Sequence, residues 1–125
     1  MTKNELSRII VNSCFNIHIA LGPGLLESVY EEALAYELVN QNLLIRKQQA
    51  LPAVYKQVRL DLGFRTDLIV EDKVIIEIKS IETIAPVHHK QLLTYLKLTG
   101  IKLGLLVNFN EALIKDGIHR IVNKL

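Results

Sequence analysis

The first part of the chain repeats apolar residues at intervals of three and four, the period of an amphipathic helix. Thr2 and Glu5 have the spacing of a capping box just before this pattern begins. The segment GPG, residues 22–24, interrupts the pattern, which resumes at Leu26 and fades at NQN, residues 40–42. We therefore predict two helices, one ending near Ala20 and one beginning near Leu26.

From Leu43 to Ser80 the apolar spacing shortens to about two, and β-branched residues become frequent. Turn signals occur at Pro52 and at residues 61–63, DLG. These features predict three or four short strands, each with one apolar and one polar face.

Pro86 suits the first turn of a third helix, which we expect to run to about Leu98 and to end at Gly100. Residues 102–109, KLGLLVNF, predict another strand, and residues 118–125 predict a final short strand or helical turn. The expected order, roughly ααββββαβ, is typical of an α/β fold in which a mixed central β-sheet is flanked by helices.

Residues 67–80, DLIVEDKVIIEIKS, have the pattern of a buried hairpin but contain Asp67, Glu77 and Lys79. Burying the apolar even-numbered positions of both strands on one side requires even-numbered residues to pair with even-numbered ones, and a turn centred on Asp72 satisfies this. That register places Asp67 opposite or nearly opposite Glu77, with Cβ atoms about 5 Å apart, and puts Lys79 on the same face. Facing carboxylates are destabilising unless a cation relieves their repulsion.

Two kinds of cation could relieve this repulsion. Pairing with Lys79 or Arg65 would make the hairpin an ordinary polar surface. A divalent cation is the alternative, because carboxylate oxygens with few histidines nearby suit Mg²⁺ or Mn²⁺. A lysine beside such a metal could orient or deprotonate an attacking water. The residue pattern leaves both interpretations open.

Composition sets broad limits on the class of protein. The length of 125 residues and the 50% hydrophobic content fit a single domain, residues 1–125, with one core. The formal net charge of +2 permits a nucleic-acid partner without requiring one. Cys14, the only cysteine, excludes an internal disulfide and is expected to be a small buried side chain. Without a signal-like or bilayer-spanning apolar segment, we expect a soluble, cytoplasmic protein that has no membrane partner.

The arrangement of Asp67 before Glu77-Ile78-Lys79, D-(x)n-E-x-K, resembles the signature of the PD-(D/E)XK nuclease superfamily. Residues 24–30, GLLESVY, are similar to the G-x-x-E-x-x-Y motif of the GxxExxY protein family. The resemblance to that family covers nearly the whole chain. It implies a restriction-endonuclease-like core that hydrolyses phosphodiester bonds of nucleic acid with the help of a metal ion.

Two further motifs resemble the RecB-like branch of the superfamily. Gln91 and Tyr95 form Q-x-x-x-Y, and Gly63 precedes Asp67 by four residues. By this resemblance Gln91 and Tyr95 would support the metal site or hold the nucleic-acid strand. The spacing of an ordinary amphipathic boundary would be the same, so that alternative stays open.

The resemblance also implies roles for individual residues. Asp67 and Glu77 would be acidic ligands of Mg²⁺ or Mn²⁺, with the backbone carbonyl of Ile78 as a third ligand. Lys79 would position or activate water and stabilise charge on the phosphate. Glu27 would orient a metal-bound water and is a further candidate ligand, although the helix dipole alone favours a carboxylate at a helix start.

Other polar and aromatic residues have two interpretations each. Tyr30, one turn after Glu27, could hydrogen-bond at the site or pack in the core, as aromatic residues on a helix face usually do. His88 and His89 are neighbours that do not face each other on a helix, so we interpret them as a solvated pair.

The resemblance implies a nucleic-acid partner, DNA rather than RNA, and a homodimer or a partner protein that helps to enclose a duplex. Five basic residues could form a phosphate-contacting strip or be ordinary solvated surface: Arg46, Lys47, Lys56, Arg59 and Arg65. Two alternatives to a nuclease remain. One is a noncatalytic nucleic-acid-binding or assembly module with the same fold, and the other is a scaffold with a salt-bridged hairpin.

Overall fold

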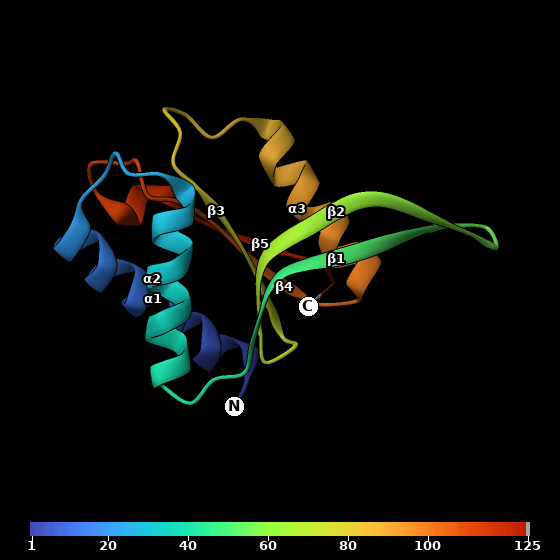
Figure 1. Cartoon of the computed structure of the whole chain (residues 1–125), viewed down its shortest axis with the longest axis horizontal. Helices are drawn as coiled ribbons and strands as arrows, with labels where there is room; N and C mark the ends of the chain where they lie inside the picture. Colours follow the sequence, from blue (N-terminus) through green and yellow to red (C-terminus); the bar gives the residue numbers. More distant parts are fainter. Residues whose placement is uncertain (125) are drawn as a thin grey trace.

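The computed structural model of the chain describes residues 1–124, except for the side chains of residues 52, 53 and 60–64. Its elements, in chain order, are α1 (Lys3–Leu21), α2 (Glu27–Asn40), β1 (Ile45–Tyr55), β2 (Val58–Val70), β3 (Val74–Lys79), α3 (Pro86–Thr99), β4 (Leu103–Asn108), the 3₁₀ turn η1 (Ile114–Gly117) and β5 (Ile118–Val122). Figure 1 shows their arrangement.

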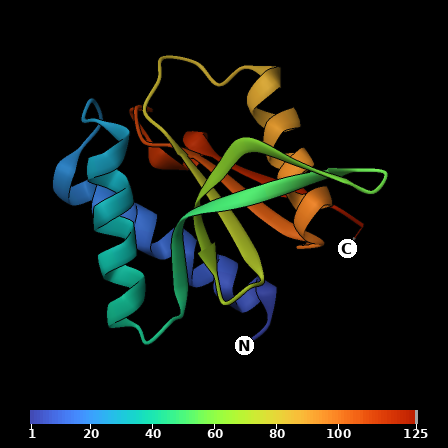
Figure 2. The same ribbon diagram turned by 45° about the vertical axis from the view of Figure 1, so that its right-hand side comes forward.

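The strands form a single five-stranded sheet in the order β1-β2-β3-β4-β5. Neighbours are antiparallel, except that β3 and β4 are parallel and are joined through α3. Helices α1 and α2 cover one face of the sheet and α3 covers the other (Figures 1 and 2). The mixed sheet flanked by helices is the predicted α/β architecture.

The helix boundaries follow the predicted signals. Both hydrogen bonds of the capping box form: the Glu5 N–H donates to Thr2 Oγ1 at 3.1 Å, and the Thr2 N–H donates to Glu5 Oε1. Pro86 occupies the first turn of α3, and Gly100 ends that helix with a φ of 76°, the left-handed conformation that glycine adopts without strain. The sequence signals for these ends are therefore confirmed.

The segment between α2 and the hairpin of β2 and β3 differs from the prediction. Three strands precede α3, which is within the predicted three or four, but the first two are long instead of short. The order is therefore ααβββαββ instead of ααββββαβ, and the turn lies at residues 56–57 instead of at Pro52 or residues 61–63. Pro52 is tolerated because β1 is an edge strand and because its register with β2 shifts between Leu51 and Ala53. At the other end of the chain β5 is the short strand expected there, antiparallel to β4.

The core has two clusters, one on each face of the sheet. On the α1 and α2 face lie the even-numbered residues of β2 and β3, as predicted: Leu68, Val70, Val74, Ile76 and Ile78. The prediction of a polar second face is wrong, because Ile69, Ile75 and Leu106 are buried there under α3. Glu77 and Lys79, the charged residues at odd-numbered positions of β3, therefore lie on the face of the sheet that α3 covers.

Two smaller expectations concern Cys14 and membranes. Cys14 is buried as predicted, and burial raises the pKa of its thiol to about 12, which makes it a poor nucleophile. Within residues 1–124 no helix has the length and apolar content that crossing a bilayer demands.

Candidate active site

The hairpin of β2 and β3 has the predicted register, and the candidate site lies where its strands separate. Val70 pairs with Val74 around a turn in which Glu71 and Asp72 both have positive φ, and the pairing ends at Leu68 and Ile76. Asp67, the next residue of β2 beyond the last pair, lies at this fork. Its Oδ2 accepts the backbone N–H of Ile78 at 2.7 Å. The side chain of Asp67 thus continues the strand pairing and is held rigidly beside β3.

Glu77 is buried on the α3 side of the sheet, with 7% of its surface exposed. Its Oε1 has no hydrogen-bond partner among the described residues. Burial first, and the neighbouring Asp67 carboxylate second, raise the pKa of Glu77 to about 9, although the charge of Lys79 acts in the opposite direction. The fork therefore contains a carboxyl group that only a nearby cation would hold in its charged form at neutral pH.

Glu27 approaches the same end of β3 from the start of α2. Its Oε2 accepts the backbone N–H of Ser80 at 3.2 Å, immediately after Lys79. An open cavity of about 520 Å³ lies here, lined by residues of the loop before α2, Glu27, Ser80 and Asn110. The predicted helix-borne acid therefore lines an open space at the end of β3 and is bound to the residue that follows Lys79.

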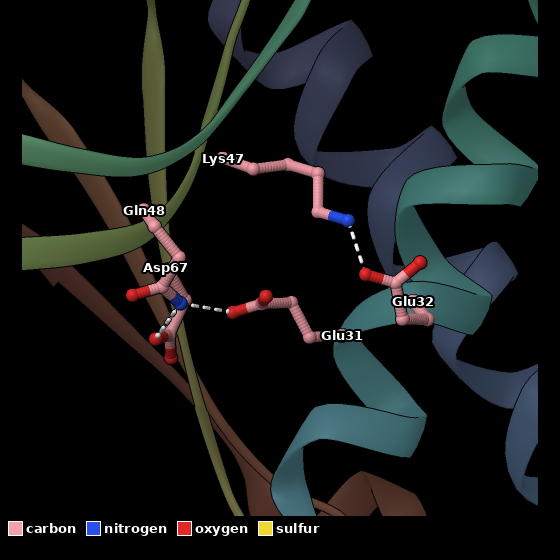
Figure 3. A network of polar contacts seen from close by, with 5 residues as sticks. All are labelled: Glu31, Glu32, Lys47, Gln48 and Asp67. Atoms are coloured by element: carbon pink, nitrogen blue, oxygen red, sulfur yellow. Dashed lines mark hydrogen bonds and ion pairs between the residues drawn. The ribbon is translucent and has the colours of Figure 1, made fainter.

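The sequence analysis missed two residues at the site, Glu31 and Gln48. Gln48 Nε2 donates to Glu31 Oε1 at 2.6 Å and to Asp67 Oδ1 at 3.2 Å, so one amide bridges two carboxylates (Figure 3). Burial raises the pKa of Glu31, and the charge of Asp67 adds to this rise, whereas the hydrogen bond from Gln48 lowers it. One signal was present, since Glu31 lies four residues after Glu27 on the same side of α2.

Helix α3 brings one of its two candidate residues to the carboxylates. Tyr95 is buried, and the pKa of its hydroxyl is raised by burial and by the charges of Glu77 and Asp67. Its hydroxyl therefore lies within electrostatic range of the acidic pair. Gln91, one turn earlier, is exposed, and its side chain makes no hydrogen bond within the described part of the chain.

Tyr30 lies in the core on the α1 and α2 side of the sheet. Its ring stacks on Phe109, with centroids 4.4 Å apart. Its hydroxyl donates to the carbonyl of Gly22 at 2.6 Å and accepts the N–H of Leu25 at 3.1 Å. Tyr30 thus packs in the core and fixes the loop that leads to Glu27.

Replacing Tyr30 with phenylalanine should destabilise the fold by about 1–2 kcal/mol, because two buried hydrogen bonds to the loop are lost while the stacked ring remains. Urea denaturation measures this free energy of unfolding. The matched control is Tyr36→Phe, since Tyr36 is 66% exposed and should tolerate the change. Equal losses in the two variants would contradict the role assigned to the Tyr30 hydroxyl.

Comparison with known families agrees with this geometry. A model of the PD-(D/E)XK nuclease superfamily matches residues 4–121, nearly the whole chain. The chain belongs to the PD-(D/E)XK nuclease superfamily. Comparisons with curated proteins and with solved structures find no match.

Nucleases of this superfamily typically use divalent metals such as Mg²⁺ or Mn²⁺, and the residues of the fork fit such an ion. In the part of the chain whose side chains are described, no three carboxylate, histidine or cysteine side chains gather into a metal-binding group. Asp67 and Glu77 nevertheless offer hard oxygen donors, and the unpartnered Oε1 of Glu77 lacks a cation or donor. Mg²⁺ suits such a set, because it is commonly held by one or two carboxylates together with water and substrate phosphate.

The histidines are not the solvated pair that the sequence suggested. His88 Nδ1 accepts the N–H of Ala85 at 2.9 Å and so caps the start of α3. The ring of His89 contacts His119 of β5 edge-on, with centroids 5.0 Å apart. Both side chains are half-buried because α3 packs closely on β4 and β5, which the local spacing could not indicate.

Proposed function

We propose that this chain is a metal-dependent nuclease that hydrolyses phosphodiester bonds, with DNA as a better substrate than RNA. The observation that carries the proposal is the buried Glu77, whose oxygen has no partner, beside an Asp67 carboxylate held by the Ile78 amide. A buried acid beside a second carboxylate is costly unless a cation joins them. Membership of a nuclease superfamily supports the same conclusion.

Asp67 and Glu77, with the Ile78 carbonyl, would hold Mg²⁺ or Mn²⁺. When bound, the ion supplies a Lewis acid that polarises the phosphate and lowers the pKa of water. Lys79 lies close enough to Glu77 to lower its pKa, and its ammonium group would stabilise charge on the phosphate and orient the attacking water. Glu27, fixed by the Ser80 amide, would accept a hydrogen bond from that water or act as a further ligand.

Four other residues would act through the metal ligands, Lys79 and Glu27. Gln48 joins Glu31 to Asp67 and would keep the Asp67 carboxylate in one orientation. Tyr95 covers the acidic pair from α3, and we place its hydroxyl among the supporting groups with Gln91 further along the same helix. Tyr30 supports Glu27 indirectly by holding the loop before α2.

The finer assignments belong to the same proposal. The G-x-x-E-x-x-Y motif at residues 24–30 supports placing the chain in the GxxExxY family, and Gln91 and Tyr95 support the RecB-like branch. We infer that residues 1–125 act as one nuclease domain in the cytoplasm, whose reducing conditions suit the single Cys14. A second copy or a partner protein would complete the enclosure of a duplex.

The test is cleavage of labelled duplex DNA, single-stranded DNA and RNA by the purified protein in Mg²⁺ and in Mn²⁺. We expect the parent protein to cleave DNA, and Asp67→Ala to lose about 100-fold or more of this activity because a metal ligand is worth several kcal/mol. The control is Asp116→Ala, an exposed acid on η1.

Unchanged cleavage by Asp67→Ala would contradict the assignment of the site. A parent protein that binds nucleic acid but cleaves none of the three substrates would favour the noncatalytic binding module. A scaffold would do neither and would gain no thermal stability from either metal, since only a ligand that prefers the folded state stabilises it.

A further inference from the structure

The hairpin of β1 and β2 continues beyond the body of the molecule as a two-stranded arm, residues 51–65 (Figure 1). Leu51 anchors its base in the cluster under α3. Residues 54–59, at its tip, are all exposed, and Val54, Tyr55 and Val58 are 57–63% exposed. Apolar side chains on a projecting tip are unlike the polar turn expected of a solvated hairpin, and they point to a binding surface.

The arm is positively charged. It contains Lys56, Arg59 and Arg65 but only one acidic residue, Asp61. The other members of the basic strip are neutralised on the body, where Arg46 pairs with Asp72 and Lys47 pairs with Glu32. The arm therefore has a formal excess of two positive charges by its sequence, whereas the strip residues on the body are ion-paired.

The basic residues of the arm extend along β2 from its tip toward Asp67. Arg59 pairs with Val54 and Arg65 pairs with Ala50, and these two partners are four residues apart on β1. The register of β1 with β2 shifts between these two pairs, so Arg59 lies beyond the shift, toward the tip of the arm, and Arg65 lies before it. Arg65 precedes Asp67 by two residues on β2, and residues two apart on a strand share a face.

The length of the arm matches a single duplex that also occupies the site. Eight residues separate Arg59 from Asp67. At about 3.3 Å per residue, reduced by the register shift, they span roughly 20–25 Å, or six to seven base-pair steps of about 3.4 Å. This is less than one helical turn, and a two-stranded ribbon also fits the width of the major groove.

We propose that the arm is a duplex-DNA-binding element that contacts phosphates on one side of the bond to be cleaved. This inference rests on the proposed function only for the identity of the polymer. Lys56, Arg59 and Arg65 contact the phosphates, while Tyr55 and its apolar neighbours contact sugars and base edges in the groove.

The test is the affinity for a duplex of about 30 base pairs, measured by fluorescence anisotropy in EDTA over a series of salt concentrations. The arm variant combines Lys56→Gln, Arg59→Gln and Arg65→Gln. The control variant removes equal charge elsewhere, with Lys97→Gln, Lys102→Gln and Lys115→Gln, three exposed residues outside the arm.

The arm variant should bind at least about tenfold more weakly at low salt, with a salt dependence shallower by two to three, because each lost phosphate contact removes about one unit of slope. The control variant should bind as the parent does. A charge-conserving variant, with Lys56→Arg, Arg59→Lys and Arg65→Lys, should retain binding, which separates loss of charge from loss of folding.

Equal binding by the arm variant and the parent would overturn the proposal, as would a parent protein that does not bind duplex DNA. An arm variant whose mass by light scattering falls from dimer to monomer would also overturn it, because the arm would then contact a second copy of the chain. Weakened binding in a protein that cleaves nothing would uphold the arm and remove the proposed hydrolysis, so the two failures are distinguishable.

Discussion

Replacing Lys79 with alanine is expected to lower turnover by about two to three orders of magnitude while leaving metal binding intact. Lys79 lies near the acidic pair, since its charge lowers the pKa of Glu77, and it forms no ion pair within the described residues. Its positive charge is therefore available to a phosphate. Removing a cation from beside a divalent metal also relieves repulsion, so metal affinity should stay the same or rise slightly.

The measurement combines kcat at saturating Mn²⁺ with a metal titration followed by thermal unfolding. Lys97→Ala, an exposed lysine near the end of α3, is the matched control and should leave both quantities unchanged. A Lys79→Ala variant that loses metal-dependent stabilisation together with turnover would show that Lys79 builds the metal site. Full turnover in that variant would exclude it from the reaction.

The register of the acidic hairpin could be predicted because alternation has a period of two and one face is apolar. Pairing even-numbered residues with even-numbered ones buries Leu68 and Ile76 on the same side, a turn centred on Asp72 satisfies this condition, and the structure has that pairing. The helix ends at Thr2 and Gly100 could be predicted for a similar reason, since each depends on a local hydrogen bond or backbone angle.

The features that the sequence did not predict depend on contacts between distant segments. Gln48 is 19 residues from Asp67, and it reaches both Asp67 and Glu31 from a backbone position with a φ of 49° inside β1. No local pattern indicates this contact. Likewise the sequence could not show that α3 covers Ile75 and Glu77, because that depends on how the crossover between β3 and β4 packs.

Pro52 and residues 61–63 show how turn residues can mislead. They signal turns in isolation, yet both lie within long strands. The register shift between Leu51 and Ala53 accommodates them, and the resulting arm could not be distinguished from two shorter strands by residue preference alone. The sequence therefore indicated the basic residues of the candidate DNA-binding surface, but it did not indicate that some of them lie on a projecting arm.

Glu77→Gln should make the metal-free protein more stable at neutral pH, although it removes a proposed metal ligand. Burial and the Asp67 carboxylate raise the pKa of Glu77 to about 9 in the folded state, from an ordinary value of 4.5. Between these values the unfolded chain releases the proton and the folded chain keeps it, so the stability of the parent falls as pH rises through this window. Glutamine carries no such charge and can donate a hydrogen bond to Asp67.

At about pH 7.5 in EDTA the gain should be about 2 kcal/mol or more, a rise in Tm of roughly 5–10 °C. At about pH 3.5 the two proteins should be equally stable, because the parent carboxyl is then largely protonated in both states. Glu82→Gln, at an exposed carboxylate, is the control and should follow the parent at every pH.

Added Mg²⁺ or Mn²⁺ should reverse the order. The parent gains stability from a bound ion in proportion to the logarithm of its concentration, whereas Glu77→Gln should gain little because one of its two carboxylate ligands is missing. A variant less stable than the parent in EDTA would mean that Glu77 is stabilised by a partner other than a metal. Retention of the full metal effect would mean that the ion binds elsewhere. The opposite signs expected with and without metal follow from one cause, a buried carboxylate whose cost only a cation can offset.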